Sequence, residues 1–282
     1  MQLTPARAWL TAGPLLALIA AALLLPFGWR SADLLHACLS GGPGGGCALQ
    51  ELWADRFYVD AVARTVALSA ASTALGLVLG LGAALHLVAH PRWEKPVAVL
   101  AGLGANFAGV PLALALTLLL GSQGVLTTLA QKSLSLAGLL QGWDLNSDAG
   151  LLLAFTAFQV PLAVVLLMAP VRLLDPALAE AAATLGARPA TFWRRVGLPL
   201  LAPSLIETAS LLFANAAAAY ATPFALAGTA SPVLAVRIAA AVSGDIFSQP
   251  ELATALSLVM AVLLLAVIVG GRLWSARLRR SA

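Results

Sequence analysis

Long apolar stretches separated by short polar ones make up most of this chain. An α-helix needs about 20 consecutive apolar residues to cross the hydrocarbon of a bilayer. Stretches of about this length occupy residues 8–29, 62–88, 97–120, 150–171, 201–226 and 252–271, and Thr222-Pro223 interrupts the fifth of them. The pattern therefore predicts an all-α, polytopic membrane protein with six transmembrane helices.

The first apolar stretch has a competing interpretation as a cleaved signal peptide. It is long, Pro14 and Pro26 interrupt it, and no small-x-small cleavage site follows closely. Leu35 to Cys38 is weakly similar to a lipoprotein cleavage box, but Arg30 and Asp33 separate it from the apolar stretch. These features favour a retained helix.

Residues 30–60 are polar and rich in glycine, which predicts a loop after the first helix. The only two cysteines of the chain, Cys38 and Cys47, flank the glycines. If this loop is periplasmic, we expect a disulfide between them, because thiols there are oxidised and a short loop closes easily. Two unpaired thiols are the alternative.

Two further patterns concern the helices themselves. Gly76, Gly80 and Gly82 give the second stretch a stripe of small residues on which another helix can pack closely. The connection between the third and fourth stretches is polar, and its Leu-rich part can lie on the membrane surface as a short helix.

Hydrophobic residues make up 61% of the chain and charged residues only 10%, whereas a soluble domain carries about 25% charged residues. The composition excludes an ordinary soluble protein. The net charge of +4 could suggest a nucleic-acid ligand, but the positive charge lies mainly in connections on one face of the bundle. We therefore expect membrane lipid, and no nucleic acid, as a partner.

Six spans place both termini on one side of the membrane, and the 16 Lys and Arg residues indicate which side. The side of the termini carries Arg7, Arg92, Lys95, Arg172, Arg188, Arg194, Arg195, Arg272, Arg277, Arg279 and Arg280. The opposite side carries Arg30, Arg56, Arg64, Lys132 and Arg237. Because basic residues concentrate on the cytoplasmic side, both termini and residues 175–203 are predicted to be cytoplasmic, in a bacterial inner membrane.

The sequence DPALAEAAATLGARPATFWRRVGLPLLAP, residues 175–203, predicts two short helices joined at a bend. Asp175 can accept an N-terminal amide hydrogen, and Pro176 suits the first helical position. Gly186 can adopt the left-handed conformation that ends a helix, and Pro189 is well placed to begin the second one. We refer to residues 175–203 as the finger.

Glu180-Ala181-Ala182, Gly186 and the run Val196-Gly197-Leu198-Pro199 stand at the intervals of a known signature. The spacing resembles the EAA motif of the inner-membrane permease subunits of binding-protein-dependent ABC importers, with Val in place of the usual Ile. An amphipathic helix lying on the headgroups is the alternative, but it does not explain these intervals.

The resemblance covers about Val62 to Gly271 and implies the fold of a type I ABC importer permease bundle. It divides the chain into an N-terminal transmembrane helix with a periplasmic loop (1–61), the permease domain (62–271) and a cytoplasmic basic tail (272–282). It also implies partners: two copies of an ABC ATPase subunit, a second permease subunit, identical or related, and a periplasmic substrate-binding protein.

The same resemblance assigns roles within the finger, which would be the coupling helix that docks on the ATPase. Glu180 would meet a basic residue of the ATPase, Ala181 and Ala182 would permit close approach, and Gly186 would form the bend. Leu198 and Pro199 would anchor the return of the finger to the membrane. ATP and Mg²⁺ would bind the ATPase, and this chain would bind no cofactor.

The chain lacks the motifs of an enzyme. Lys95 follows Glu94 and Lys132 follows Gln131, so neither lysine belongs to a Gly-Lys-Ser/Thr phosphate-binding loop. Zinc, serine-nucleophile and paired-aspartate motifs are also missing. His86 and His90 share a helical face but lack a third ligand, so no metal site is predicted.

A secondary carrier or membrane scaffold that works without an ATPase is the alternative function. Such a carrier is expected to place carboxylates at mid-membrane, and Glu207 is the only candidate. It falls near the cytoplasmic Leu198-Pro199, so we expect it to pair with finger arginines or to cap a backbone group.

Four polar residues stand deep within the predicted spans: Asn106, Gln159, Asn215 and Tyr220. Pro161 and Pro223 nearby can free backbone carbonyls. Polar groups at this depth usually face protein or water, so these residues either border the translocation path or form hydrogen bonds between packed helices.

The segment YATPFALAGTASPVLAVRIAAAVSGDIF is similar to permeases of the polyamine importer group, whose relatives carry ferric iron, thiamine, sulfate, molybdate or phosphonates. The resemblance therefore implies a small solute, with polyamine as the first hypothesis. No span carries a carboxylate near its middle that would suit a cation.

Overall fold

The computed structural model describes residues 22, 24–39, 47–132, 143–174, 176–243 and 249–281. Within these ranges every regular element is a helix, which confirms the predicted all-α class. An N-terminal helix covers residues 24–39. The others are α2 (Ala48–Ala54), α3 (Arg56–Ala89), α4 (Pro91–Asn106), α5 (Val110–Leu120), α6 (Val125–Lys132), α7 (Asp148–Arg172), α8 (Pro176–Thr184), α9 (Pro189–Phe192), η1 (Trp193–Gly197), α10 (Leu198–Ala217), α11 (Ala221–Ala227), η2 (Gly228–Ala230), α12 (Leu234–Ser243) and α13 (Pro250–Ser281).

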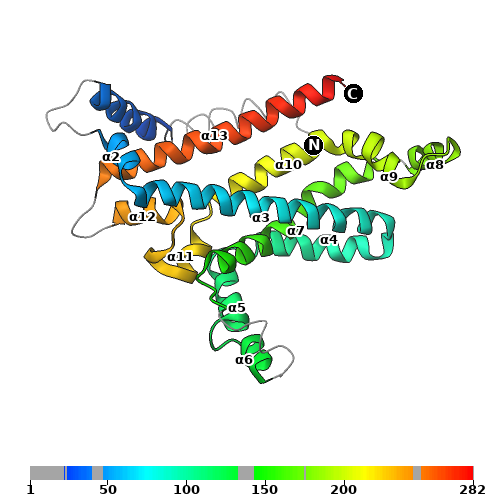
Figure 1. Ribbon diagram of the computed structural model, residues 1–282, viewed down its shortest axis with the longest axis horizontal. Helices are drawn as coiled ribbons and strands as arrows, with labels where there is room; N and C mark the ends of the chain where they lie inside the picture. Colours follow the sequence, from blue (N-terminus) through cyan, green and yellow to red (C-terminus); the bar gives the residue numbers. More distant parts are fainter. Residues whose placement is uncertain are drawn as a thin grey trace, which may run out of the picture.

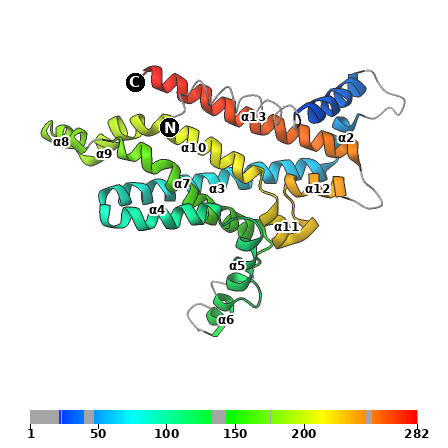
Figure 2. The same cartoon turned by 180° about the vertical axis from the view of Figure 1, so that it is seen from behind.

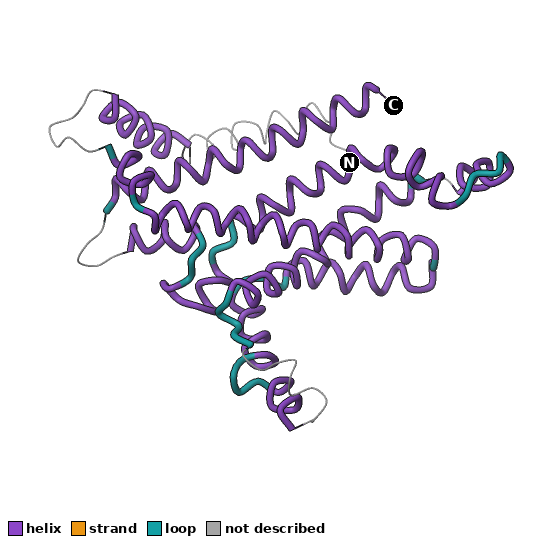
Figure 3. Tube along the Cα trace, viewed as in Figure 1, coloured by secondary structure: helices purple, strands orange, loops and turns teal. Residues whose placement is uncertain are grey.

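The long helices α3, α7, α10 and α13 lie side by side and form the body of the molecule (Figure 1). The finger and the C-terminus lie at one end of this body, and α2 and α12 lie at the other (Figures 1 and 2). Helices α5 and α6 project away from the bundle as an arm (Figure 3). Five helical segments in the described residues are long and apolar enough to cross a membrane, or six if the α11–η2 and α12 pair, bent by 65°, counts as one.

Close packing of α3 against α7 organises the body. A Cβ on Gly76 would lie 3.1 Å from the Gln159 Cβ, and a Cβ on Gly80 would overlap the Ala163 methyl group. Two glycines of the predicted stripe are therefore packing positions. Gly82 is not one of them, because a Cβ there would meet nothing within 4 Å. It lies on the exposed side of α3, six residues beyond Gly76 and therefore off the shared face.

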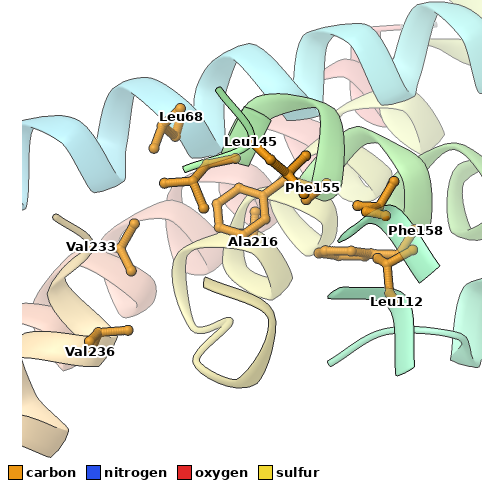
Figure 4. Packing of buried hydrophobic residues seen from close by; sticks show 11 residues of the cluster. Leu68, Leu112, Leu145, Phe155, Phe158, Ala216, Val233 and Val236 are labelled. Carbon is orange, nitrogen blue, oxygen red and sulfur yellow. The ribbon is translucent and has the colours of Figure 1, made fainter. Parts of the chain in front are cut away.

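Buried apolar side chains form a cluster between α3, α5, α7, α10 and α12 in the half of the body away from the finger. Phe155 and Phe158 lie at its centre with their ring centroids 6.0 Å apart, edge to face (Figure 4). A second cluster, in the finger half, joins α3, α4, α7 and α10 and contains Leu87, Leu167 and Leu201. The two clusters hold α7 at the centre of the bundle.

Ion pairs fix α7 at both ends. Arg64 Nη1 of α3 lies 3.1 Å from a carboxylate oxygen of Asp148, where α7 begins. Arg172, the last residue of α7, pairs with Glu94 in the first turn of α4. Both arginine side chains are about half exposed (51% and 53%), so each pair contributes at most about 1 kcal/mol. Their effect is to set the register of neighbouring helices.

Two predicted spans are broken where the apolar pattern continues. The third was expected to be one helix over 97–120, but the chain leaves α4 after Asn106 and starts α5 at Val110, with Gly109 at φ 77°. The fifth was expected to break at Thr222-Pro223, but α10 already ends at Ala217. Pro223 stands in the first turn of α11, where a missing N–H is tolerated.

The prediction of a loop over residues 30–60 was wrong in its extent. The described N-terminal helix continues through Arg30 and Asp33 to residue 39, with both charged side chains exposed, and α2 and α3 follow. The predicted basic tail also belongs to a helix, because α13 runs through residues 272–281 without interruption. Leu, Arg and Ala are strong helix formers, which extends both helices beyond their apolar parts. Residues 8–21 and the glycines at 41–46 lie outside the described residues.

Cys38 and Cys47 form a disulfide, with their Cα atoms 4.9 Å apart. It joins the end of the N-terminal helix to the start of α2, which packs on α3 and α13. We predict that iodoacetamide will not label the full-length protein, purified without reductant and denatured, until a reductant is added. Mass spectrometry measures the result. Labelling without reduction would show that the native chain carries free thiols.

Candidate functional site

Helix α8 of the finger ends in a left-handed glycine. Gly186 has φ 78°, its N–H donates to the Ala183 carbonyl at 2.9 Å, and the Ala187 N–H donates to the Ala182 carbonyl at 3.0 Å. These two hydrogen bonds are those of a Schellman motif. The second helix starts at Pro189, so the bend lies where the sequence placed it. Asp175, the predicted cap, lies outside the described residues.

The second half of the finger is continuous with the fifth span. Helix α9 passes through the π-helical turn η1 directly into α10, so Pro189 to Ala217 form one rod of 29 residues. Leu198 and Pro199 are the first residues of α10. The Leu198 N–H bonds to the Trp193 carbonyl, five residues back. Pro199 has no N–H to donate to its i−4 carbonyl, and the wider π turn accommodates this loss.

The tip of the finger is exposed on nearly all sides. Glu180 and Ala181 are exposed and Ala182 is half-buried, while Leu178 and Leu185 are 41% and 88% exposed. Among the described residues no ion pair involves Glu180. Leu178 and Leu185 therefore form a small exposed apolar surface. Because helices of nine residues are marginal in water without tertiary packing, packing of another protein on this surface would stabilise α8.

The root of the finger is packed into the body. Phe192 is buried and stacks edge to face on Trp193, with ring centroids 5.8 Å apart. Trp193 in turn packs on the cluster of Leu87, Leu167 and Leu201 in the finger half. Trp193 therefore connects the root of the finger to α3, α7 and α10.

The two helix breaks contact each other away from the finger. The Gly109 N–H, between α4 and α5, donates to Thr222 Oγ1 at 2.9 Å. Thr222 lies in the first turn of α11 and is 2% exposed. Irregular backbone at membrane depth is stable only where protein buries it or a cavity adjoins it. The sequence reading missed this contact, although Gly109 before Val110-Pro111 was a usable signal for a new helix start.

The four predicted path residues fall into two environments. Asn106 and Tyr220 flank the two breaks, and Asn215 lies near the end of α10; all three are exposed. Gln159 is fully buried, and its Nε2 donates to Ser72 Oγ at 3.0 Å and to the Leu212 carbonyl at 3.4 Å. Its surroundings are those of a hydrogen bond between packed helices, the alternative stated above.

Two other predicted features have definite partners. The rings of His86 and His90 stack with centroids 4.3 Å apart. Glu207 accepts hydrogen bonds from Arg279 Nη2 at 2.7 Å and from Ser275 Oγ at 2.9 Å. The prediction that Glu207 pairs with finger arginines or caps a backbone group was wrong in its partner. Glu207 pairs with an arginine of α13, because α13 packs along α10 at this end.

The fold of this chain is similar to that of chains in a solved bacterial ABC transporter. Two crystal structures of a bacterial ABC transporter for alginate, an acidic polysaccharide, are similar to this chain. They contain chains that superpose on it with TM-scores of 0.68 and 0.69. The alignments cover 96% of this chain and 95% and 96% of those chains, at 18% and 19% identity. One of these transporters is in complex with a periplasmic protein bound to an alginate pentasaccharide.

The relatives found by sequence match a smaller part of the chain. The molybdenum transport system permease protein ModB of Mycobacterium bovis and of Mycobacterium tuberculosis is 33% identical over 124 residues, which are 44% of this chain. The match spans about half, 47%, of the length of these relatives. No family model matches the chain.

Proposed function

We propose that this chain is the transmembrane permease subunit of a binding-protein-dependent ABC importer. The observation that carries the proposal is the bent, exposed finger at one end of a permease fold, with Glu180, Ala181 and Ala182 on its tip. In this proposal both termini are cytoplasmic, the protein is in the inner membrane, and the fingers of two permease subunits dock on two ATPase subunits. The comparisons give no support to an ATPase-independent carrier or scaffold.

The mechanism follows from the rod that joins the finger to the fifth span. A helix of 29 residues is about 43 Å long, so it reaches from the proposed ATPase surface to the break after Ala217. Closure of the ATPase pair on ATP and Mg²⁺ moves the fingers, and the rod transmits this motion to the Gly109–Thr222 contact. The bundle then alternates between inward-open and outward-open states, because the two ATPase states bind the finger differently.

An acidic solute is the substrate class that we favour. The relatives are named for molybdenum and for the acidic polysaccharide alginate, and neither name supports the polyamine hypothesis. The segments around the two breaks, residues 98–120 and 208–230, contain no Asp or Glu that would bind a polyamine. The exposed amide and hydroxyl groups of Asn106, Asn215 and Tyr220 can donate hydrogen bonds to an anion.

Co-purification tests the permease assignment. Affinity-tagged full-length chain, co-expressed with the ATPase encoded nearest to it, should retain that ATPase, and a variant with the finger sequence reversed should insert but lose it. Solute uptake by the purified chain alone, without nucleotide or companion subunit, would contradict the proposal.

The acidic substrate class has a separate test. Stimulation of ATP hydrolysis by binding protein loaded with molybdate, but not with spermidine, would support this class, and the opposite result would contradict it.

The path hypothesis gives a separate prediction. Leu in place of Asn215 or Tyr220 should lower uptake about tenfold or more, because each change removes hydrogen bonds that a desolvated solute needs. Both side chains are exposed, so the amount of assembled transporter should stay unchanged. Uptake is measured in proteoliposomes to which the binding protein has been added. Normal uptake by both variants would remove these residues from the path.

A further inference from the structure

The finger end of the α10–α13 contact contains an open cavity of about 440 Å³. Its outer part, near the end of α13, is lined by Glu207, Arg272, Ser275 and Arg279. Its inner part, toward the middle of both helices, is lined by Leu211, Ile268 and Ser210, whose hydroxyl donates to the Ile206 carbonyl of its own helix. The cavity therefore changes from basic and polar to apolar along the direction in which α13 crosses the bundle.

The outer part carries more positive than negative charge. Glu207 is the only carboxylate of the lining, and it pairs with Arg279. Arg272 is exposed and forms no ion pair within the described part of the chain. Arg277 and Arg280 lie on the same end of α13 but outside the lining of the cavity. An anion that enters the cavity can bind Arg272 without displacing any carboxylate.

Neighbouring side chains place the cavity at headgroup depth. Trp274 is 64% exposed and Leu273 is 60% exposed between the arginines, and tryptophan is enriched at membrane–water interfaces. Toward the middle of the helices, Leu211, Leu265 and Val269 are exposed apolar residues. An amphipathic ligand can thus keep its charge beside the arginines and its chains against leucine and valine.

We propose that this cavity binds an anionic phospholipid, with the phosphate at Arg272 and Arg279 and the acyl chains along Leu211 and Ile268. Basic pockets between transmembrane helices bind such headgroups. Inorganic phosphate offers the same anionic chemistry but has nothing for the apolar part. A zwitterionic phospholipid has the chains but no net charge.

Native mass spectrometry of the full-length chain, purified in detergent, tests the proposal. Protein is equilibrated with vesicles of phosphatidylglycerol, with vesicles of phosphatidylcholine, or with inorganic phosphate. We expect retention of phosphatidylglycerol alone. Each arginine near an anionic lipid contributes roughly a fivefold change in affinity, so Arg272→Gln with Arg279→Gln should weaken retention about 25-fold. Arg277→Gln, on the same helix but outside the lining, is the matched control and should bind as the wild type does.

Two single variants separate lipid binding from a structural role of the ion pair. Glu207→Gln should raise retention a few-fold, since it frees Arg279, whereas a purely structural pair would give no gain. Ala276→Trp fills the cavity without changing charge and should lower retention even if the double variant does not fold. Equal retention by all variants, equal loss in Arg277→Gln, or binding of inorganic phosphate with the same affinity would each overturn the proposal.

Discussion

Replacing Gly186 by valine should lower binding-protein-dependent uptake by about one order of magnitude while the protein still inserts and folds. Gly186 has φ 78°, and a left-handed conformation costs a residue with a Cβ about 1–2 kcal/mol, with β-branched residues at the upper end. A Cβ there would meet nothing within 4 Å, so the cost is conformational. The finger would then leave its bent form, and the body would be unaffected.

The matched controls use residues of different backbone preference at the same bend. Asn tolerates the left-handed region, so Gly186→Asn should retain most of the uptake, and Ala187→Val tests bulk without a positive φ. ATP hydrolysis and uptake are measured in proteoliposomes that contain the partner ATPase, with retention of the ATPase measured in parallel. Full activity of Gly186→Val would show that the bend has no part in coupling.

The bend could be predicted because its causes are local. Gly186 and Pro189 specify a left-handed end and a new helix start within four residues, and no distant contact is needed. The break at Phe107–Gly109 has only one local signal, Gly109 before Val110-Pro111, within an otherwise apolar span. Only the hydrogen bond to Thr222, 113 residues away in sequence, satisfies the Gly109 N–H there.

The predicted positions of the span ends were wrong for a related reason. Apolar length sets where a helix can cross the hydrocarbon, but helix propensity and hydrogen bonding set where it ends. The rod from Pro189 to Ala217 continues past Pro199 because a π turn takes up the missing hydrogen bond. Likewise the spacing of Gly76, Gly80 and Gly82 predicts a packing stripe but does not say that Gly82 is turned away from α7.

Leucine at Gly80 should strongly destabilise the body of the protein. Its Cβ would overlap the Ala163 methyl group and lie 3.2 Å from the Ala163 carbonyl carbon, so α3 and α7 must separate. Overpacking of this kind costs about 1–3 kcal/mol. Separation also breaks the 3.0 Å bond from Gln159 to Ser72 and leaves the Gln159 Nε2 group only its 3.4 Å bond to the Leu212 carbonyl, at about 1 kcal/mol more. We expect a clear fall in the thermal unfolding temperature and in the yield of folded protein.

Gly82, two residues after Gly80 in α3, provides a matched control for this prediction. Gly82→Leu adds the same apolar bulk to the same helix, where a Cβ meets nothing within 4 Å, and should leave the unfolding temperature unchanged. In a double-mutant cycle, Ala163→Gly should recover part of the stability that Gly80→Ala loses, since it removes the methyl group that the new Cβ meets. The packing would be contradicted if Gly80→Leu and Gly82→Leu unfolded at the same temperature, or if Ala163→Gly gave no recovery. Either result would show that α3 and α7 do not pack against each other at Gly80.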